Sequence, residues 1–271
     1  MKVLDRKIIQ NGRMADLKIY LWEDSQEYQT GVTRPCILIC PGGGYHFVSD
    51  RENQAVAMQY LAMGYHVAVL TYSVAPAMWP TALHQLAEAV AVLREHSAEW
   101  FIDPDRIVVE GFSAGGHLAA SLAVLWHRPE IAASIGRTPE QIRPNAMILC
   151  YAVLIYGEKT HLKSWQNLLG SDEERKKQLS LEKLVTPNCP PCFLWHTWAD
   201  TTVPVENSLY FACALRENGV PFDLHIFERG RHGLSLANDL TAKTDLQKNV
   251  CIERWMEQSH LWLRQLFESD I

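Results

Sequence analysis

One serine in this sequence stands in a pattern suited to nucleophilic catalysis. Ser113 is the central residue of GFSAG at residues 111–115, with an apolar run before it and an alanine-rich run after it. In this context G-x-S-x-G marks a sharp turn from a strand into a helix, which leaves the serine hydroxyl projecting above a sheet. The alternative is a glycine-rich turn without chemistry, and the strand and helix patterns on either side favour the catalytic interpretation.

A serine hydroxyl is a weak nucleophile at neutral pH, so it needs a base within hydrogen-bond reach and a third group that orients the base. For a serine on such a turn, the acid should come next along the chain and the histidine last. Asp200 follows an apolar run at residues 193–198, and His232 follows another at residues 222–227. We therefore expect both on loops at the same sheet edge as Ser113.

Other titratable residues compete for these two roles. Asp223 and Glu228 are alternative acids, but one begins a predicted strand and the other ends it very near the histidine, so Asp200 is preferred. His232 is chosen among eleven histidines for its loop position and its place in the chain order. The competing histidines are His66 and His196 in strand patterns, His84, His96, His117 and His127 in helical patterns, and His46 and His161 as candidate wall residues of the site.

A second glycine-rich stretch, PGGGY at residues 41–45, follows the buried strand predicted at residues 36–40. Acyl transfer places negative charge on the carbonyl oxygen, and each backbone N–H aimed there contributes on the order of 3 kcal/mol in the transition state. Gly43 and Gly44 offer two such groups, and Ala114, at the start of the helix after the serine, offers a third. Without a following G-K-[ST], the glycines favour this oxyanion hole over a phosphate cradle.

The elements that must position these residues alternate between strand and helix. This alternation predicts an α/β fold with a mainly parallel, doubly wound sheet, and an Asn-Gly turn at residues 11–12 adds an antiparallel N-terminal hairpin. Strands are expected at residues 7–9, 17–22, 36–40, 66–72, 107–110, 146–151, 192–198 and 222–227, and helices at 51–63, 80–96, 114–126, 205–217 and 247–267.

Residues 1–271 are expected to form one domain, because no linker divides the chain. Residues 156–190 break the alternation and are polar, with a short helix predicted around residues 172–179. They form either a small cap over the site or a surface excursion. The excursion is slightly preferred, because a lid that shields large lipids needs more apolar surface.

The composition excludes several classes of protein. With 48% apolar and 21% charged residues, the chain is neither disordered nor fibrous. The chain has a net charge of −6 and no long basic block, so it lacks the positively charged surface expected of a nucleic-acid-binding protein. No apolar run approaches about 18 residues, so no membrane contact is expected. The opening residues lack the apolar core of a secretory signal, so we expect a cytoplasmic protein.

The seven cysteines are an odd number, and most have the apolar neighbours of buried positions. Cys189 and Cys192 have C-x-x-C spacing, but the pair runs straight into an apolar stretch rather than opening a helix, and no second pair exists to complete a zinc site. We therefore predict packing roles for most of the cysteines, and no metal site.

Taken together, these motifs make the chain similar to the α/β-hydrolase superfamily, and within it to small bacterial esterases whose oxyanion loop resembles that of hormone-sensitive-lipase-type enzymes. It looks most like the acetyl esterases often labelled xylanase-associated or carbohydrate esterases. The likeness covers nearly the whole chain and includes PGGGY at 41–45, DPDRIVVEGFSAGGHLA at 103–119, VTPNCPPCFLWHTWADTTVPVENS at 185–208 and FERGRHGLSLA at 227–237.

The resemblance implies an eight-stranded sheet, a triad of Ser113, Asp200 and His232, and hydrolysis of short acyl esters without a cofactor. It also implies the same three oxyanion donors, Gly43, Gly44 and Ala114. One departure is Pro41, which stands where the lipase-like pattern usually begins with histidine. Since that histidine would brace the loop, the bracing must come from elsewhere.

The expected function is that of a serine carboxylesterase, whose partner is a small-molecule ester such as an acetylated sugar or oligosaccharide. Bulky residues beside the catalytic loops could narrow the acyl pocket or pack beneath the loops, and two tryptophans could stack on a sugar or lie in the core. The bulky residues beside the loops are Tyr45, His46, Trp198 and Leu234, and the two tryptophans are Trp79 and Trp165.

Two other functions remain open from the sequence. One is a peptidase or formamidase-like amidase of the same fold, although a chain of 271 residues has no room for the propeller that such peptidases often carry. The other is a catalytically silent binding protein on a hydrolase scaffold. Apolar residues spaced along residues 252–267 suit either core packing or a homo-oligomer contact.

Overall fold

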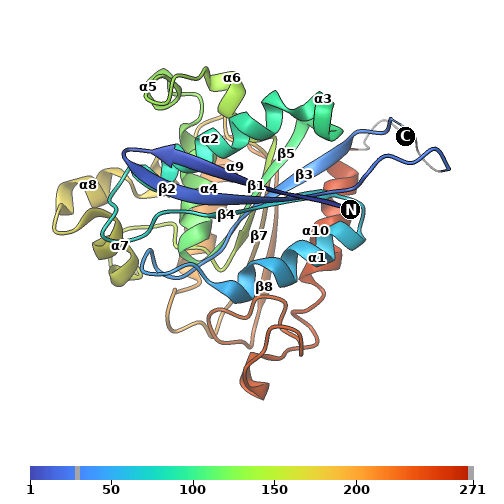
Figure 1. Cartoon of the computed structure of the whole chain (residues 1–271). Coiled ribbons are helices and arrows are strands. Elements are labelled where there is room, and N and C mark those ends of the chain that lie inside the picture. Colours follow the sequence, from blue (N-terminus) through green and yellow to red (C-terminus); the bar gives the residue numbers. More distant parts are fainter. Residues whose placement is uncertain (28–30, 268–271) are drawn as a thin grey trace.

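A computed structural model describes residues 1–27 and 31–267 of the chain. Its centre is one eight-stranded sheet in the order β1-β2-β4-β3-β5-β6-β7-β8 (Figure 1). β1 and β2 pair in antiparallel fashion, as do β2 and β4, and every later neighbour is parallel. The predicted sheet and its N-terminal hairpin are confirmed. The strands are β1 Lys2–Gln10, β2 Arg13–Leu21, β3 Arg34–Cys40, β4 His66–Thr71, β5 Ile102–Phe112, β6 Ala146–Cys150, β7 Cys192–Thr197 and β8 Phe222–Phe227.

Helices cover both faces of the sheet (Figure 1). On one face, α2, α4 and α9 pack against the larger apolar cluster, and on the other α1 and α10 pack against the second cluster. Because both faces are covered, the central strands contain continuous apolar runs, at residues 36–40 in β3, 67–70 in β4 and 146–150 in β6. The helices are α1 Gln54–Ala62, α2 Thr81–Glu95, α3 Ser97–Trp100, α4 Ala114–Leu125, α5 Pro129–Ala133, α6 Pro139–Ile142, α7 Leu162–Leu169, α8 Glu173–Gln178, α9 Glu206–Glu217 and α10 Trp255–Phe267, with short 3-10 turns η1 Asp50–Glu52, η2 Leu181–Lys183 and η3 Asp245–Gln247.

Several elements differ in extent from the sequence prediction, among them β1, which begins at Lys2 rather than at residue 7. β5 begins at Ile102, five positions earlier than expected, because Ile102 pairs with Arg34 across an irregularity in the ladder. The last helix begins at Trp255 rather than at residue 247. The side chain of Asn249 explains this difference, because its oxygen accepts the N–H groups of Cys251 and Ile252 and so competes with helical hydrogen bonding.

Residues 156–190 hold more structure than the sequence indicates. The short helix predicted around residues 172–179 is present as α8, and Asp172 caps it by accepting the Arg175 N–H. α7 was not predicted. From α7, the Asn167 amide donates to the Gly44 carbonyl at 2.8 Å. This contact joins the segment to the glycine loop.

Two general properties bear on the environment of the protein. Among the helices of the described residues, none has both the length and the apolar character needed to cross a membrane. The cysteines are free thiols, and both members of the C-x-x-C pair, Cys189 and Cys192, are buried.

One buried histidine at the start of β4 gives the fold a pH dependence. His66 accepts the Trp22 N–H at Nδ1 and donates from Nε2 to the Phe101 carbonyl. Burial lowers the pKa of His66 to about 4, despite the hydrogen bond to Phe101. In the unfolded chain the pKa should be about 6.5, so the unfolded state binds the proton first as the pH falls.

We therefore expect this histidine to make the free energy of unfolding about 2.5 kcal/mol smaller at pH 4.5 than at pH 7. Urea denaturation of the wild type and of His66→Gln at both pH values measures the effect. The variant should lose less stability on acidification than the wild type. Equal losses in the two proteins would assign the acid sensitivity to other groups.

Candidate active site

Ser113 lies at the turn between β5 and α4, with φ at 53° and ψ at −117°. A non-glycine residue pays for such a conformation in backbone strain and keeps it only where the surroundings impose it. The neighbouring Gly115 explains why the turn fits. A Cβ on Gly115 would come 2.0 Å from the Cys40 carbonyl oxygen, so only glycine lets α4 begin this close to β3. The result is a serine hydroxyl presented at the carboxyl edge of the sheet.

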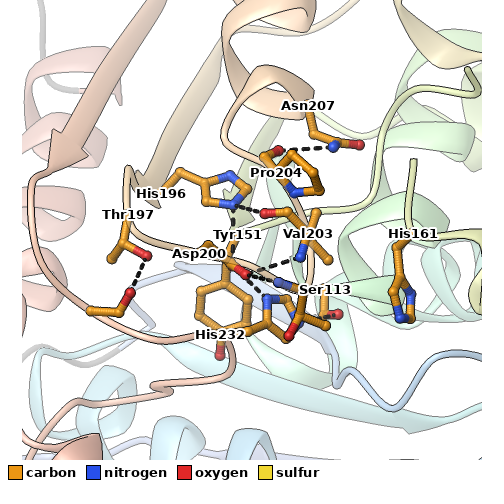
Figure 2. Close-up of polar contacts among 12 residues, drawn as sticks. Ser113, Tyr151, His161, His196, Thr197, Asp200, Val203, Pro204, Asn207 and His232 are labelled. Atoms are coloured by element: carbon orange, nitrogen blue, oxygen red, sulfur yellow. Dashed lines mark hydrogen bonds and ion pairs between the residues drawn. The ribbon is translucent and has the colours of Figure 1, made fainter. Parts of the chain in front are cut away.

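The structure brings the three residues of the predicted triad together (Figure 2). Ser113 Oγ lies 2.8 Å from His232 Nε2, and His232 Nδ1 lies 2.6 Å from Asp200 Oδ2. An ionised carboxylate can only accept, so Nδ1 carries the hydrogen and Nε2 is left to accept the serine proton. The three side chains therefore form one hydrogen-bonded chain in the direction that a nucleophile and its base require.

Asp200 is held by donors on both carboxylate oxygens. Oδ1 accepts the backbone N–H groups of Thr202 and Val203, and Oδ2 faces His232 and His196, whose Nε2 is 3.3 Å away. Burial by itself would raise the pKa of Asp200, but the hydrogen bonds from His196 and His232 outweigh it and hold that pKa well below its usual value. The carboxylate therefore stays charged and fixed in orientation.

His196 is a residue whose role the sequence interpretation missed. Its place in a strand pattern predicts a core or wall residue rather than a member of the site, and its side chain is fully buried in β7. Its Nδ1 is 2.8 Å from Ser208 Oγ, and its Nε2 is 3.0 Å from the Val203 carbonyl. Since carbonyl and carboxylate oxygens only accept, Nε2 carries the hydrogen and shares it between Val203 and Asp200. The feature of the sequence that could have indicated this contact is the spacing of four residues between His196 and Asp200.

Bracing of the glycine loop comes from three side chains, which answers the question raised by Pro41. The Gly42 N–H donates to Glu52 Oε2 at 2.7 Å, and the Tyr72 hydroxyl donates to the Pro41 carbonyl at 2.7 Å. The third is the Asn167 amide of α7, described above. Glu52 is buried, and the sequence interpretation did not single it out.

Glu52 also connects the glycine loop to the loop of His232. Its Oε1 accepts the Tyr151 hydroxyl at 2.6 Å, and that hydroxyl accepts the Ser235 N–H at 3.0 Å. The Tyr151 ring meets the His232 imidazole edge to face, with centroids 5.1 Å apart. One buried network therefore fixes the oxyanion loop and the base relative to each other.

The predicted oxyanion donors lie around the serine. Gly43 and Gly44 line the same cavity as Ser113, and Ala114 is the first residue of α4. Within the described residues, no acceptor is recorded for the N–H groups of Gly43, Gly44 or Ala114. Free N–H groups at a helix start and on a loop beside a nucleophile suit a developing oxyanion.

A cavity of about 350 Å³ opens beside Ser113 and His232. His46 and His161 both line it, as the sequence predicts for wall residues. Burial lowers the pKa of His161, with a further contribution from the nearby His232, so the imidazole is neutral at neutral pH. Through His161, Lys163 and Asn167, residues 161–167 form part of the cavity wall. The remaining lining residues are Gly43, Gly44, Phe47, Ser49, Arg51, Glu52, Lys163, Asn167, Thr202 and Gly233.

Three residues predicted to shape the substrate pocket do not line this cavity. Tyr45 is buried beneath the glycine loop, and its hydroxyl pairs with His117 Nδ1 at 2.8 Å. Leu234 is buried in the second apolar cluster. Trp198 is 69% exposed, because β7 ends at residue 197 and its side chain turns to solvent. Trp165 is buried in the first cluster, and Trp79 packs against that cluster, so neither stacks within the cavity.

Comparison with known proteins places this geometry in a family. The BD-FAE family model matches residues 17–215. The chain belongs to the BD-FAE family. A solved structure of an acetyl ester-xyloside bifunctional hydrolase from Caldicellulosiruptor lactoaceticus is 36% identical, with a TM-score of 0.82, and the match covers 94% of this chain and 89% of that one. The carboxylesterase Cest-2923 from Lactobacillus plantarum WCFS1 is 29% identical, with a TM-score of 0.87 and 98% of both chains covered.

A curated relative of this BD-FAE chain is much longer than the chain itself. Endo-1,4-beta-xylanase B of Butyrivibrio fibrisolvens is 38% identical over 239 residues, which are 84% of this chain but only 36% of the relative. The match therefore concerns one part of that protein.

The contact between His196 and Asp200 leads to a stability prediction. Because hydrogen bonds to a charged group contribute roughly 1.5–3 kcal/mol, His196→Phe should lower the free energy of unfolding at pH 7 by about 2–3 kcal/mol. Chemical denaturation measures this loss. The control is His225→Phe on β8, because His225 is half-buried and forms no hydrogen bond recorded within the described residues. Equal losses in the two variants would contradict a specific role for His196.

Proposed function

We propose that this protein is a serine carboxylesterase that hydrolyses short acyl esters, acetyl esters foremost, through an acyl-enzyme. The observation that carries the proposal is the unbroken hydrogen-bonded chain from Ser113 Oγ through His232 to the buried carboxylate of Asp200. It opens onto a cavity that the glycine loop also lines. Nucleophile, base, orienting acid and oxyanion donors are the full set that acyl transfer requires.

In the acylation step, Ser113 Oγ attacks the ester carbonyl carbon while His232 Nε2 takes the hydroxyl proton. The resulting imidazolium is stabilised by Asp200, whose carboxylate faces Nδ1 at 2.6 Å. His232 then returns the proton to the leaving alcohol, and the acyl group remains on Ser113. In the second step a water molecule attacks the acyl carbon while His232 Nε2 takes its proton. The bond from the acyl carbon to Ser113 Oγ then breaks, His232 returns the proton to Oγ, and the carboxylic acid is released.

The charge on the carbonyl oxygen is assigned to the backbone N–H groups of Gly43, Gly44 and Ala114. Their support is positional, since the first two line the cavity and the third begins the helix after Ser113. The loop that holds the glycines is fixed by Glu52 and Tyr72 before any substrate arrives. Such preorganised donors need no rearrangement at the moment of reaction.

Acetylated sugars or oligosaccharides are the substrate class that we propose for the site. The support comes from two relatives, one named an acetyl ester-xyloside bifunctional hydrolase and the other a xylanase. A cavity of about 350 Å³, at the lower end of the range for small-molecule sites, suits a short acyl group with a small alcohol better than a long acyl chain.

We further infer that the protein acts in the cytoplasm. The support is chemical, because its cysteines are free thiols and five of them are buried, as is usual in a reducing compartment. Cell fractionation followed by immunodetection tests this inference, which recovery in the extracellular fraction would overturn.

The role of Ser113 can be tested by replacing it with alanine. Ser113→Ala should lower kcat for p-nitrophenyl acetate by at least about a thousandfold, because no other group supplies the nucleophile. The matched control is Ser121→Ala, since Ser121 is buried in the same helix and donates to the His117 carbonyl away from the cavity. The control should retain wild-type turnover.

Two results would overturn the proposed function. Retention of more than a tenth of wild-type turnover in a folded Ser113→Ala protein would remove the serine from its role. Failure of the wild type to hydrolyse any acetyl ester or to react with a fluorophosphonate would favour a catalytically silent protein. Faster cleavage of aminoacyl amides than of acetyl esters would instead point to an amidase.

A further inference from the structure

The cavity beside Ser113 carries positive charge on an otherwise acidic protein. The chain has a net charge of −6, yet the residues that line this cavity include the two cations Arg51 and Lys163 and only one acid, Glu52. Glu52 is occupied on both oxygens, since Oε2 accepts the Gly42 N–H and Oε1 accepts the Tyr151 hydroxyl. Both of its oxygens are therefore used in the loop network, and the two cations outnumber this single acid in the cavity lining.

Arg51, which lines the cavity, has guanidinium N–H groups without an acceptor among the described residues. Its Nε donates to the Thr241 carbonyl at 2.7 Å, which fixes the guanidinium in place. Its Nη2 is shielded from solvent and has no hydrogen-bond partner within the described residues. Its Nη1 lies beside Gly233, another lining residue, where a Cβ would come within 3.9 Å of it. A guanidinium has five N–H donors, and among the described residues this one donates only to the Thr241 carbonyl.

Neither cavity cation forms an ion pair with a carboxylate of the described residues. Some cations elsewhere do pair with an acid of the protein. Arg137 pairs with Glu88 at 2.8 Å and Lys159 with Glu206 at 3.1 Å. What distinguishes Arg51 and Lys163 is their position, since both line the cavity of Ser113. Arg51 is partly buried, and a partly buried guanidinium without an anionic partner is costly unless a ligand supplies one.

We propose that this cavity selects acetyl esters whose alcohol carries an anionic group, a carboxylate or a phosphate, bound by Arg51 and Lys163. The inference rests on the proposed esterase function and narrows its substrate class. An acetyl group consists of a carbonyl and a methyl and carries no charged group. The anionic group of the substrate must therefore belong to the alcohol. Among acetylated sugars, this class comprises sugars that carry an acidic group.

The roles of the two cations follow from their settings. Arg51 is held on one side by Thr241, and its Nη1, which lies beside Gly233, can donate a charge-assisted hydrogen bond to an oxygen of the anion. Lys163 is on the exposed side of α7 and contributes a point charge that draws the anion toward the cavity. Arg51 should therefore account for most of the selectivity.

Three acetyl esters of similar size test the proposal. 4-Acetoxybenzoate carries a carboxylate, 4-acetoxyphenyl phosphate carries a phosphate, and 4-acetoxybenzamide is a neutral counterpart. The measured quantity is kcat/KM for each ester, divided by the rate of its hydroxide-catalysed hydrolysis to remove differences in leaving group. The wild type should favour at least one anion over the amide by about tenfold, as expected for charge-assisted hydrogen bonds. The preferred anion distinguishes carboxylate from phosphate recognition.

Variants of the two cations then locate the preference. Arg51→Gln should reduce the ratio of anionic to neutral ester by at least about fivefold, Arg51→Lys should reduce it less, and Lys163→Gln should reduce it by about twofold. The matched control is Lys177→Gln, which removes the same charge from an exposed position on the neighbouring helix α8, outside the cavity. Its ratio should equal that of the wild type.

The outcomes separate this inference from the function on which it rests. If the wild type hydrolyses none of the three esters, the proposed function fails. If it hydrolyses the amide at least as well as both anions, or if Lys177→Gln lowers the ratio as much as Arg51→Gln, only the anion site fails. Should the Arg51 variants not fold, Lys163→Glu compared with Lys177→Glu gives the same test, because the charge reversal at the cavity should lower the ratio more.

Discussion

The buried carboxylate of Asp200 is the constraint on which the rest of the site depends. A carboxylate removed from water is tolerated only when its oxygens are hydrogen-bonded, and here four donors converge on it from three parts of the chain. The turn at residues 202–203 supplies two, His196 on β7 supplies the third, and His232 supplies the fourth. The hydrogen bond between His232 and Asp200 therefore orients the base and also stabilises the buried carboxylate at the end of β7.

The topology of the sheet explains how residues so far apart meet. Because β3, β5, β7 and β8 run parallel, the loops after them emerge at one edge, and these loops carry the glycines, Ser113, Asp200 and His232. Parallel strands alone do not set distances of less than 3 Å. The Glu52–Tyr151 hydrogen bond fixes the glycine loop relative to the histidine loop. The oxyanion donors and His232 therefore keep fixed positions relative to each other. Rigidity of this kind is what preorganised catalysis needs.

Two cations line the cavity of Ser113, although the chain as a whole is acidic. Several cations are matched by acids on neighbouring elements, as Arg137 is by Glu88, whereas Arg51 and Lys163 face the cavity without a matching carboxylate. Membership of the BD-FAE family describes the scaffold, and such local differences in charge are where members of one fold can diverge in substrate. The acidic net charge of the chain makes this local exception visible.

The amino-acid sequence was enough to predict the order of the strands, the parallel sheet with its N-terminal hairpin, and the positions of Ser113, Asp200 and His232 on loops at one edge. These features follow from local patterns, since apolar runs, glycine turns and chain order are properties of neighbouring residues. Only the tertiary structure decided which side chains surround them. His196, Glu52 and Arg51 acquire their roles through partners distant in sequence or through burial, and Tyr45, Trp198 and Leu234 lie outside the cavity for the same reason. Proximity along the chain does not fix the direction in which a side chain points, because the packing of the loops decides it.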